Sequence, residues 1–314
     1  MPAIDYQERS AATRHAENQG VGAAIKRGYA QALEDGIDVV AVMDGDGQMD
    51  PDHLHRIIEP VVEGRAAYSK GNRLHRQVDH AGMSRWRLFG NGLLTLLTRA
   101  ASGYWEMSDP QNGYTAISRE ALETIPFQTL YDRYGFTNEV LVQLNTYDFT
   151  IANVTHPAVY GDEESHIDYT SFVPVLSWLL FQRFCWRLKT RYVVKEFHPI
   201  VTYYPLGIGS MIAGVAGGMY MQTTSGGGFV GAMAALAVVL LGFLMFSLAI
   251  LFDVERNSGS VVSVTNTNPT STAEVEDVTW IESDDKTVIG SVNTGSRTMS
   301  NESLPNESDG GVTE

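Results

Sequence analysis

The stretch that decides the fold reads Val39-Val40-Ala41-Val42-Met43-Asp44-Gly45-Asp46-Gly47-Gln48-Met49-Asp50-Pro51. Its first five residues are apolar and mostly β-branched, which is typical of a strand buried on both faces of a parallel sheet. Two carboxylates separated by one glycine follow directly. Ligands of open α/β sheets bind beyond the carboxyl ends of the strands. The pattern therefore places Asp44 and Asp46 where a ligand would bind.

This acidic turn has two interpretations. Two carboxylates on one turn offer hard oxygen ligands to Mg²⁺ or Mn²⁺, the ions that accompany a diphosphate. However, Asp, Gly and Pro are also the usual turn formers, and they can end a strand without binding anything. The stretch alone leaves both interpretations open.

The flanking sequence predicts an α/β fold. Apolar residues at helical spacing predict helices near residues 20–36, 51–63, 83–99 and 136–147. Short apolar runs predict strands near residues 38–43, 66–71, 115–118 and 149–154. Strands that alternate with helices indicate a sheet covered by helices, here a mixed sheet. We expect neither a strand nor a signal peptide in residues 1–17, which are polar.

The charge composition narrows the classes of partner. The 314 residues carry a formal net charge of −15, and only five of the 22 basic residues are lysines. This balance argues against general nucleic-acid binding and is typical of a protein kept soluble in high salt, as in a halophile. The single cysteine, Cys185, excludes an internal disulfide and a cysteine-based zinc site.

A long apolar segment predicts a membrane anchor. Residues 199–252 are 54 residues without a charged side chain. A spanning helix needs about 20 apolar residues, so this segment is long enough for two, with a break at Gln222–Gly228. The basic cluster Arg183–Lys195 precedes the first span and predicts that this side, with the catalytic part and the tail, lies in the cytoplasm.

These features divide the chain into four parts. We expect an α/β domain, an amphipathic membrane-interface segment, a two-helix transmembrane hairpin and an acidic tail; the respective ranges are 1–165, 166–197, 198–253 and 254–314. The tail is rich in Ser, Thr, Asn and acids, a composition that favours disorder.

Five short motifs follow one another in a characteristic order. They are Asn18-Gln19-Gly20-Val21-Gly22-Ala23-Ala24, Asp44-Gly45-Asp46-Gly47-Gln48, Gly71-Asn72-Arg73, Asp109 with Asn112-Gly113-Tyr114, and Glu139. In this order the chain resembles family 2 glycosyltransferases, in particular the dolichyl-phosphate mannose and glucose synthases with two C-terminal membrane helices. The resemblance runs from about residue 18 to residue 252.

The resemblance implies a GT-A (Rossmann-like) fold and an inverting, metal-dependent hexose transfer. The donor would be a nucleotide sugar, UDP- or GDP-linked, and the acceptor a polyprenyl (dolichyl) phosphate at the cytoplasmic membrane face, as in protein glycosylation. Mg²⁺ or Mn²⁺ and the donor diphosphate would lie among Asp44, Asp46 and Gln48. Gly22 and Asn112 would also contribute to donor binding.

The resemblance also implies an acceptor site. Arg73, Arg87 and Asn91 would hold the acceptor phosphate; for Arg73 and Arg87, solvated surface charges are the alternative interpretation. Glu139 would lie near the sugar or position the acceptor region, and with Asp46 it is a candidate catalytic residue. Gln182-Arg183-Phe184-Cys185-Trp186 is a near miss of the Gln-x-x-Arg-Trp motif of processive polysaccharide synthases, and we interpret it as interfacial.

One departure from the family affects the expected fold. Family members begin with a strand that carries a Pro-x-Tyr-Asn-Glu-like turn and then a second strand that ends in an acid. Since this sequence contains neither, we expect a sheet that lacks its N-terminal strand or strands, with an open edge. Two alternatives therefore stay open. One is a catalytically inactive, truncated membrane-anchored protein, and the other is a glycosyltransferase with another lipid or a polysaccharide as acceptor. The sequence does not indicate an oligomeric state.

Overall fold

The computed structural model describes residues 11–13, 17–45, 49–73, 85–156, 169–224, 228–264, 278–283 and 287–292. Its helices are α1 (Val21–Glu34), α2 (Leu54–Val62), α3 (Arg85–Ser102), α4 (Arg119–Thr124), α5 (Phe136–Thr146), α6 (Tyr169–Lys189), α7 (Ile200–Thr224) and α8 (Phe229–Arg256). Its strands are β1 (Ala11–Thr13), β2 (Val39–Asp44), β3 (Tyr68–Asn72), β4 (Thr115–Ser118), β5 (Ile151–Thr155), β6 (Val261–Val264), β7 (Val278–Ser283) and β8 (Thr287–Val292). A π-helical turn, Thr190–Lys195, follows α6.

The strands form one mixed sheet in the order β1-β7-β8-β2-β4-β3-β5-β6. β2 pairs antiparallel with β4, and β4 pairs antiparallel with β3, so β2 and β3 run in the same direction. β5 pairs parallel with β3, and β6 pairs parallel with β5, so both continue in that direction. The predicted mixed α/β sheet is confirmed, and all four strands expected between residues 38 and 154 form.

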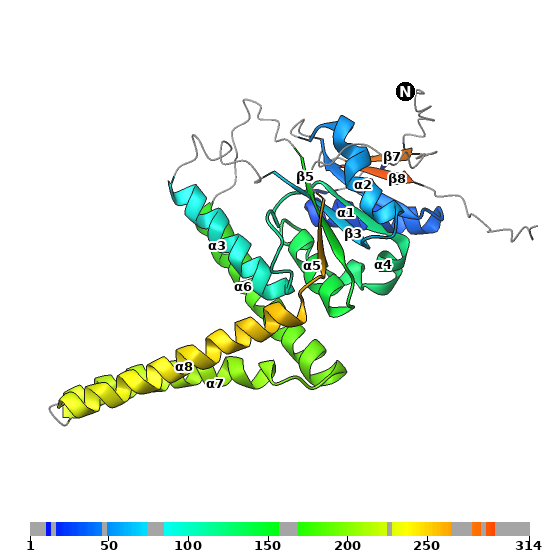
Figure 1. Ribbon diagram of the computed structural model, residues 1–314. Helices are drawn as coiled ribbons and strands as arrows, with labels where there is room; N and C mark the ends of the chain where they lie inside the picture. The colour runs from blue at the N-terminus through cyan, green and yellow to red at the C-terminus, as the bar shows by residue number, and fades with distance from the viewer. Residues whose placement is uncertain are drawn as a thin grey trace, which may run out of the picture.

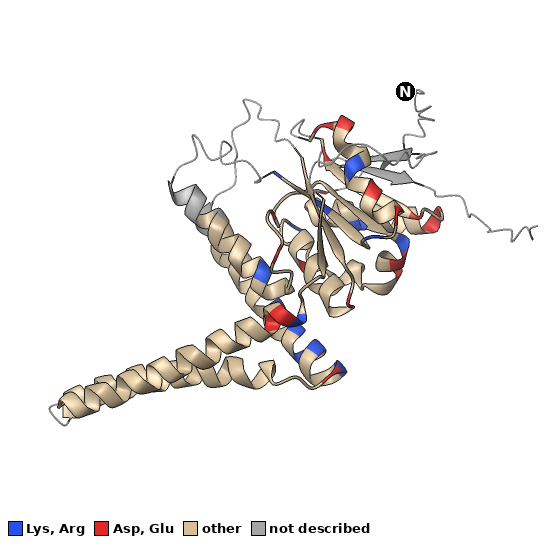
Figure 2. Cartoon of the chain, in the orientation of Figure 1, with Lys and Arg blue, Asp and Glu red and all other residues tan. Residues whose placement is uncertain are grey.

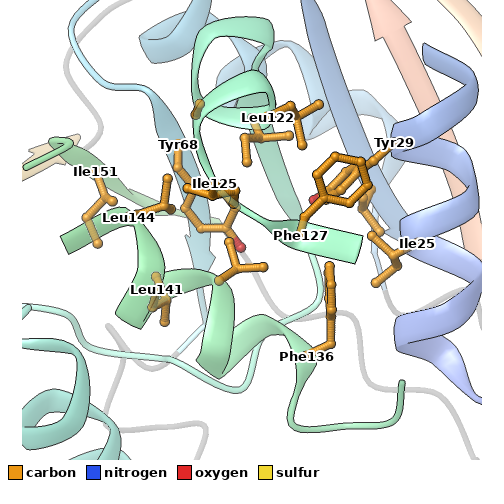
Figure 3. Packing of buried hydrophobic residues seen from close by; sticks show 14 of the residues in the cluster. Ile25, Tyr29, Tyr68, Leu122, Ile125, Phe127, Phe136, Leu141, Leu144 and Ile151 are labelled. Atoms are coloured by element: carbon orange, nitrogen blue, oxygen red, sulfur yellow. The ribbon is translucent and has the colours of Figure 1, made fainter. Parts of the chain in front are cut away.

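Helices cover both faces of the sheet, which explains why β2 reads as a continuous apolar run. Val40 and Val42 pack on the side of α1, α4 and α5, whereas Val39 and Ala41 pack on the side of α2. Figure 3 shows the first of these cores, where Tyr29 of α1 meets the ring of Phe127 edge-on at a centroid distance of 5.8 Å.

The helix starts follow local sequence chemistry. Asp50 caps the 3₁₀ turn before α2 by accepting a hydrogen bond from the backbone N–H of Asp52 at 3.0 Å, and Pro51 occupies the first position of that turn. α1 begins at a Gly20 whose φ of 98° lies in the left-handed region that glycine adopts without strain.

α7 and α8 extend side by side away from the α/β domain (Figure 1). Both are long and apolar enough to cross a membrane, and only 22% and 11% of their most apolar stretches are buried within the protein. Among the described residues, Lys, Arg, Asp and Glu lie in the α/β domain and near its junction with these helices and not along their extended part, as the colours of Figure 2 show. The expected pair of apolar helices is confirmed, with the break at residues 225–228.

A buried polar network, which we call the junction cluster, fixes α8 to the α/β domain. Arg187 of α6 and Asp253 of α8 are both fully buried and form an ion pair at 2.7 Å. Tyr192, Trp105 and Asn257 donate hydrogen bonds to the same carboxylate at 2.7, 3.2 and 3.1 Å. One carboxylate therefore binds four side chains from separate parts of the chain.

Two expectations about the ends of the chain were wrong. Residues 11–13 form β1, although a polar N-terminal segment argued against any strand there. Three segments of the tail, β6, β7 and β8, join the sheet instead of remaining without structure, because backbone pairing satisfies their N–H and C=O groups. As a result, the side of β2 that faces away from β4 pairs with β8.

Candidate active site

The topology gathers polar residues at one edge of the sheet. β2, β3 and β5 run in one direction, so their carboxyl ends lie at the same edge, and the loop that enters the antiparallel β4 reaches that edge as well. These ends carry Asp44 of β2, Asn72 and Arg73 after β3, and His156 after β5. The loop before β4 adds Asp109 and Asn112. Binding sites of open α/β sheets occupy this position.

Asp44 lies against the backbone of Gly113. A Cβ atom at Gly113 would lie 2.5 Å from Oδ2 of Asp44, so only glycine leaves room for the carboxylate there. The backbone N–H of Asp44 points to the sulfur of Met49 at 3.2 Å, which holds the start of the acidic turn against its end. The Gly113 loop and the β2 carboxylate are thus in direct contact, as the order of motifs suggested.

Asp109 and Arg73 form an ion pair across the same edge. Oδ2 of the buried Asp109 accepts a hydrogen bond from Nε of Arg73 at 3.0 Å, while Arg73 remains about one-third exposed. The guanidinium is therefore oriented by a buried carboxylate and still faces solvent. This arrangement suits the binding of an anion, because the guanidinium of arginine matches the geometry of phosphate oxygens.

Asn112 is completely buried and organises the floor of the site. Its Oδ1 accepts a hydrogen bond from the N–H of Tyr114 at 3.0 Å, and its Nδ2 lies 2.9 Å from Nε2 of His156. Its backbone carbonyl accepts a hydrogen bond from Nζ of Lys70. These contacts hold the loop before β4 in place, so Asn112 fixes the position of that loop.

Lys70 supplies a buried positive charge below the two aspartates. Burial lowers the pKa of Lys70 to about 8; nearby Asp109 and Asp44 act in the opposite direction, and Arg73 adds to the lowering. Gly71, the next residue, has no space for a side chain, because a Cβ would lie 2.7 Å from Nε2 of His156. The glycine lets β3 approach His156 closely.

Glu139 lies in the first turn of α5 and is 1% exposed. Its Oε2 accepts a hydrogen bond from the backbone N–H of Tyr131 at 2.6 Å, and its Oε1 pairs with Nε of Arg183. Arg183 of α6 pairs with Glu139 and therefore faces the α/β domain, whereas we expected it to face an interface with lipid. Glu139 thus connects the helix before the membrane pair to the loop at Tyr131.

Gly22 has a packing role that is visible in the structure. A Cβ at this position would lie 2.5 Å from the carbonyl oxygen of Tyr131, so glycine allows α1 to begin directly against that loop. A pocket of about 280 Å³ lies beside this contact; it is lined by Asn18, Gly20, Val21, Arg133 and Tyr134. Gly22 shapes this pocket but does not line it.

Four of the candidate site residues have side chains outside the described part of the chain: Asp46, Gln48, Arg87 and Asn91. Their roles stay predictions. Among the described residues there is no group of three His, Cys, Asp or Glu side chains that could hold a metal ion. Of the three predicted ligands the structure describes Asp44, and its carboxylate, at the carboxyl end of β2, is the donor type that Mg²⁺ and Mn²⁺ prefer.

Sequence reasoning missed three side chains of this region: Lys70, His156 and Arg183. His156 had a usable signal, since it follows the predicted strand β5 as Arg73 follows β3, and parallel strands end at the same edge. Lys70 had a weaker one, because it lies within the strand predicted for residues 66–71 and a lysine buried in a strand needs a partner.

Comparison with known proteins agrees with this geometry. Residues 3–126 match the sequence model of glycosyl transferase family 2. The chain is 30% identical over 151 residues to a protein of Methanococcus voltae named UDP-N-acetylglucosamine–dolichyl-phosphate N-acetylglucosaminyltransferase, covering 48% of this chain and 60% of that protein. It is also 26% identical over 149 residues to an uncharacterized protein of Methanocaldococcus jannaschii, covering 48% of this chain and 61% of that protein. The chain thus spans about three-fifths of the length of these curated relatives.

Proposed function

We propose, from the match of residues 3–126 to the model of glycosyl transferase family 2, that the protein transfers a sugar from a nucleotide sugar to a polyprenyl phosphate at a membrane surface. The observation that carries the proposal is the sheet edge at which Asp44 and the Asp109–Arg73 pair meet, in a chain that continues into two long apolar helices. A soluble acceptor would give no reason for those helices, whereas a lipid acceptor requires the site to be close to a bilayer.

The donor half of the site centres on the acidic turn. We assign Asp44, Asp46 and Gln48 to the diphosphate of the nucleotide sugar and to a bound Mg²⁺ or Mn²⁺. When bound, the ion would stabilise the negative charge that develops on the leaving diphosphate. Asn112 and Gly22 act beneath and beside this position by fixing the Gly113 loop and the start of α1.

The acceptor half uses the arginines. Arg73, oriented by Asp109 at 3.0 Å, binds the acceptor phosphate together with Arg87 and Asn91 of α3. Because a phosphate monoester of a lipid carries one to two negative charges near neutral pH, it requires cations in its site, and arginine binds it through two nitrogens.

The reaction needs no general base. An ionised phosphate oxygen attacks the anomeric carbon, the bond from that carbon to the diphosphate breaks, and the configuration inverts. Glu139 has both carboxylate oxygens engaged, one by the N–H of Tyr131 and the other by Arg183. We therefore assign it a positioning role, in which it holds the Tyr131 loop, and not the transfer of a proton.

The membrane arrangement follows from α6 to α8. Several large apolar side chains of α6 and the π-helical turn are more than half exposed, namely Val175, Trp178, Phe181 and Val194. Such side chains favour the lipid interface, next to the pair of spanning helices. We propose a two-span membrane protein whose catalytic domain and tail lie in the cytoplasm, because the basic segment 183–195 precedes the first span.

The sugar is the least defined part of the reaction. The name of the M. voltae relative specifies UDP-N-acetylglucosamine, so this donor should be tested beside the hexose donors UDP-glucose and GDP-mannose. The full chain in lipid nanodiscs is incubated with each labelled nucleotide sugar, polyprenyl phosphate and Mg²⁺, and the products are extracted into organic solvent. Label in the solvent phase that depends on polyprenyl phosphate is the expected result.

Two variants connect the activity to named residues. Asp46→Asn should lower kcat about 100-fold, the magnitude typical of removing one contact to a developing charge. Arg87→Glu should raise the KM for polyprenyl phosphate far more than the Kd for the nucleotide sugar. Arg65→Glu is the matched control, because Arg65 precedes β3 and so lies at the opposite edge of the sheet.

Four results would contradict the proposal. Full activity of Asp46→Asn would exclude the acidic turn from the donor site. Equal losses toward donor and acceptor in Arg87→Glu would remove Arg87 from the acceptor site. Binding of a nucleotide sugar without transfer to any lipid would favour an inactive glycosyltransferase-like protein, and label in a glycerolipid or a polymer would identify another acceptor.

A further inference from the structure

The strand that carries Asp44 has a partner from the far end of the chain. β8 pairs antiparallel with β2 over six residues, in a register that places Val292 opposite Val39 and Thr287 opposite Asp44. β7 pairs antiparallel with β8 on its other side, and β1 then pairs with β7. The β7–β8 hairpin, residues 278–292, thus continues the sheet beyond β2, next to the candidate donor site.

Without this hairpin, β2 would be an edge strand. Its pairing with β4 uses one row of backbone groups, and the other row, which now faces β8, would lose its partners. An apolar edge strand with unpaired N–H and C=O groups is prone to bind other strands. Residues 39–42 are all at most 4% exposed, so uncovering this edge would expose a strongly apolar strand.

The hairpin also affects the position of Asp44. The Asp44–Thr287 pair is the last of the β2–β8 ladder, so β8 supports β2 as far as the residue at which the acidic turn begins. β8 also contacts α1, the helix whose start borders the pocket at Gly20. β8 therefore packs against both β2 and α1, the two elements that border the candidate donor site.

We propose that residues 278–292 are an intramolecular strand complement that closes the β2 edge and holds the donor end of the site in its binding geometry. The occupant of the edge is this segment of the same chain, which binds by strand addition. Chain length permits this assignment. The thirteen residues between β6 and β7 can span at most about 45 Å when extended, whereas the six strand spacings between them amount to about 29 Å. The statement about the donor rests on the proposed function; the statement about the sheet does not.

A proline in β8 tests the pairing in the full chain. β8 lies between β2 and β7, so Ile289→Pro removes an N–H from one of two ladders and disrupts the strand. Thr298→Pro is the matched control, because residue 298 lies beyond β8 in the same tail. Hydrogen exchange of residues 39–44 should become at least about tenfold faster in Ile289→Pro for the amides that face β8, and should not change in Thr298→Pro.

A shortened chain with the segment added back as a peptide distinguishes loss of the hairpin from general misfolding. The chain ending at Val264 lacks the hairpin, and a synthetic peptide of residues 273–296 can be added back. The peptide should restore slow exchange in β2, and it should restore the affinity for UDP-N-acetylglucosamine with Mg²⁺ that the shortened chain loses by about tenfold or more. A chain that ends at Asn293 keeps the hairpin and should behave as the full chain does.

The outcomes are distinguishable. Unchanged exchange of β2 in both Ile289→Pro and the chain ending at Val264 would overturn the proposal. Faster exchange with unchanged donor affinity would overturn its donor part. Concentration-dependent dimers whose β2 edge is protected only in the dimer would assign the hairpin to a second copy and overturn the intramolecular assignment. If the full chain binds no nucleotide sugar while β2 still responds to the hairpin, the proposed function fails and the strand complement stands.

Discussion

Replacing Asp253 by asparagine should weaken the attachment of α8 to the α/β domain and lower the free energy of unfolding. In the wild-type junction cluster, the carboxylate accepts two hydrogen bonds from Arg187, at 3.0 and 2.7 Å, and one each from Tyr192, Trp105 and Asn257. Asparagine keeps the shape but carries no charge and only one accepting oxygen. The guanidinium of Arg187 would remain buried without a counter-charge.

The size of the effect follows from the burial of the pair. Both side chains are 0% exposed, and removing one member of such a pair costs about 3–5 kcal/mol in the free energy of unfolding. For a domain of this size, 1 kcal/mol corresponds to a shift in Tm of about 2–4 °C. Asp253→Asn should therefore lower Tm by about 6–20 °C.

Thermal unfolding of the full chain in detergent micelles measures this difference. The control is Glu196→Gln, which removes an ion pair of similar length, 2.6 Å to Arg256, whose members are 71% and 46% exposed. Exposed pairs contribute about 0–1 kcal/mol, so the control should shift Tm by no more than about 4 °C. The double variant Arg187→Met/Asp253→Leu should recover most of the loss, because it leaves no unpaired charge.

The comparison between these variants can refute the reasoning. If Asp253→Asn lowers Tm no more than Glu196→Gln does, the junction cluster is not a buried ion-pair network. If the double variant is as unstable as Asp253→Asn, the loss comes from packing and not from an uncompensated charge.

Three further changes test the site. Gly113→Ala places a Cβ 2.5 Å from Oδ2 of Asp44, so kcat should fall about tenfold or more while circular dichroism stays unchanged; normal kcat would mean that the position of this carboxylate does not matter. Arg183→Met removes the cation paired with the buried Glu139 and should lower the free energy of unfolding by about 1–3 kcal/mol, whereas Arg183→Lys should lose less. Burial lowers the pKa of Lys70 from 10.5 to about 8, so above pH 8 the folded chain releases a proton that the unfolded chain keeps until pH 10.5. The stability of the wild type relative to Lys70→Met should therefore rise between pH 8 and pH 10.5, by up to about 3 kcal/mol, and a flat difference in urea unfolding would contradict this.

The central elements were predictable because their signals are local. The apolar run of β2, the capping residue Asp50 and the alternation of strands with helices each depend on a few neighbouring residues. The uncharged segment 199–252 likewise predicts α7 and α8 from composition alone. The meeting of Asp44 with the Gly113 loop followed from the order of motifs, since both lie at strand ends of one sheet.

The remaining features depend on contacts between distant residues. β7 and β8 are two short runs rich in β-branched and aromatic residues, a composition typical of strands, but the tail as a whole is acidic and polar. The pairing of β8 with β2 could not be predicted, because nothing near residue 289 specifies a partner more than 200 residues earlier. Arg183 was assigned to the interface because its neighbours are aromatic, and only the packing of α6 on α5 turns it toward Glu139.

The sheet order has a consequence for biosynthesis. β2 is synthesised 248 residues before the end of β8, and both apolar helices lie between them in the chain. At about 5–20 residues per second, the edge of β2 waits roughly 12–50 s for its partner, and α7 and α8 leave the ribosome first. β8, the last of these strands to be made, therefore pairs with β2, which is made before both apolar helices. The sheet can be completed only after translation has passed α7 and α8.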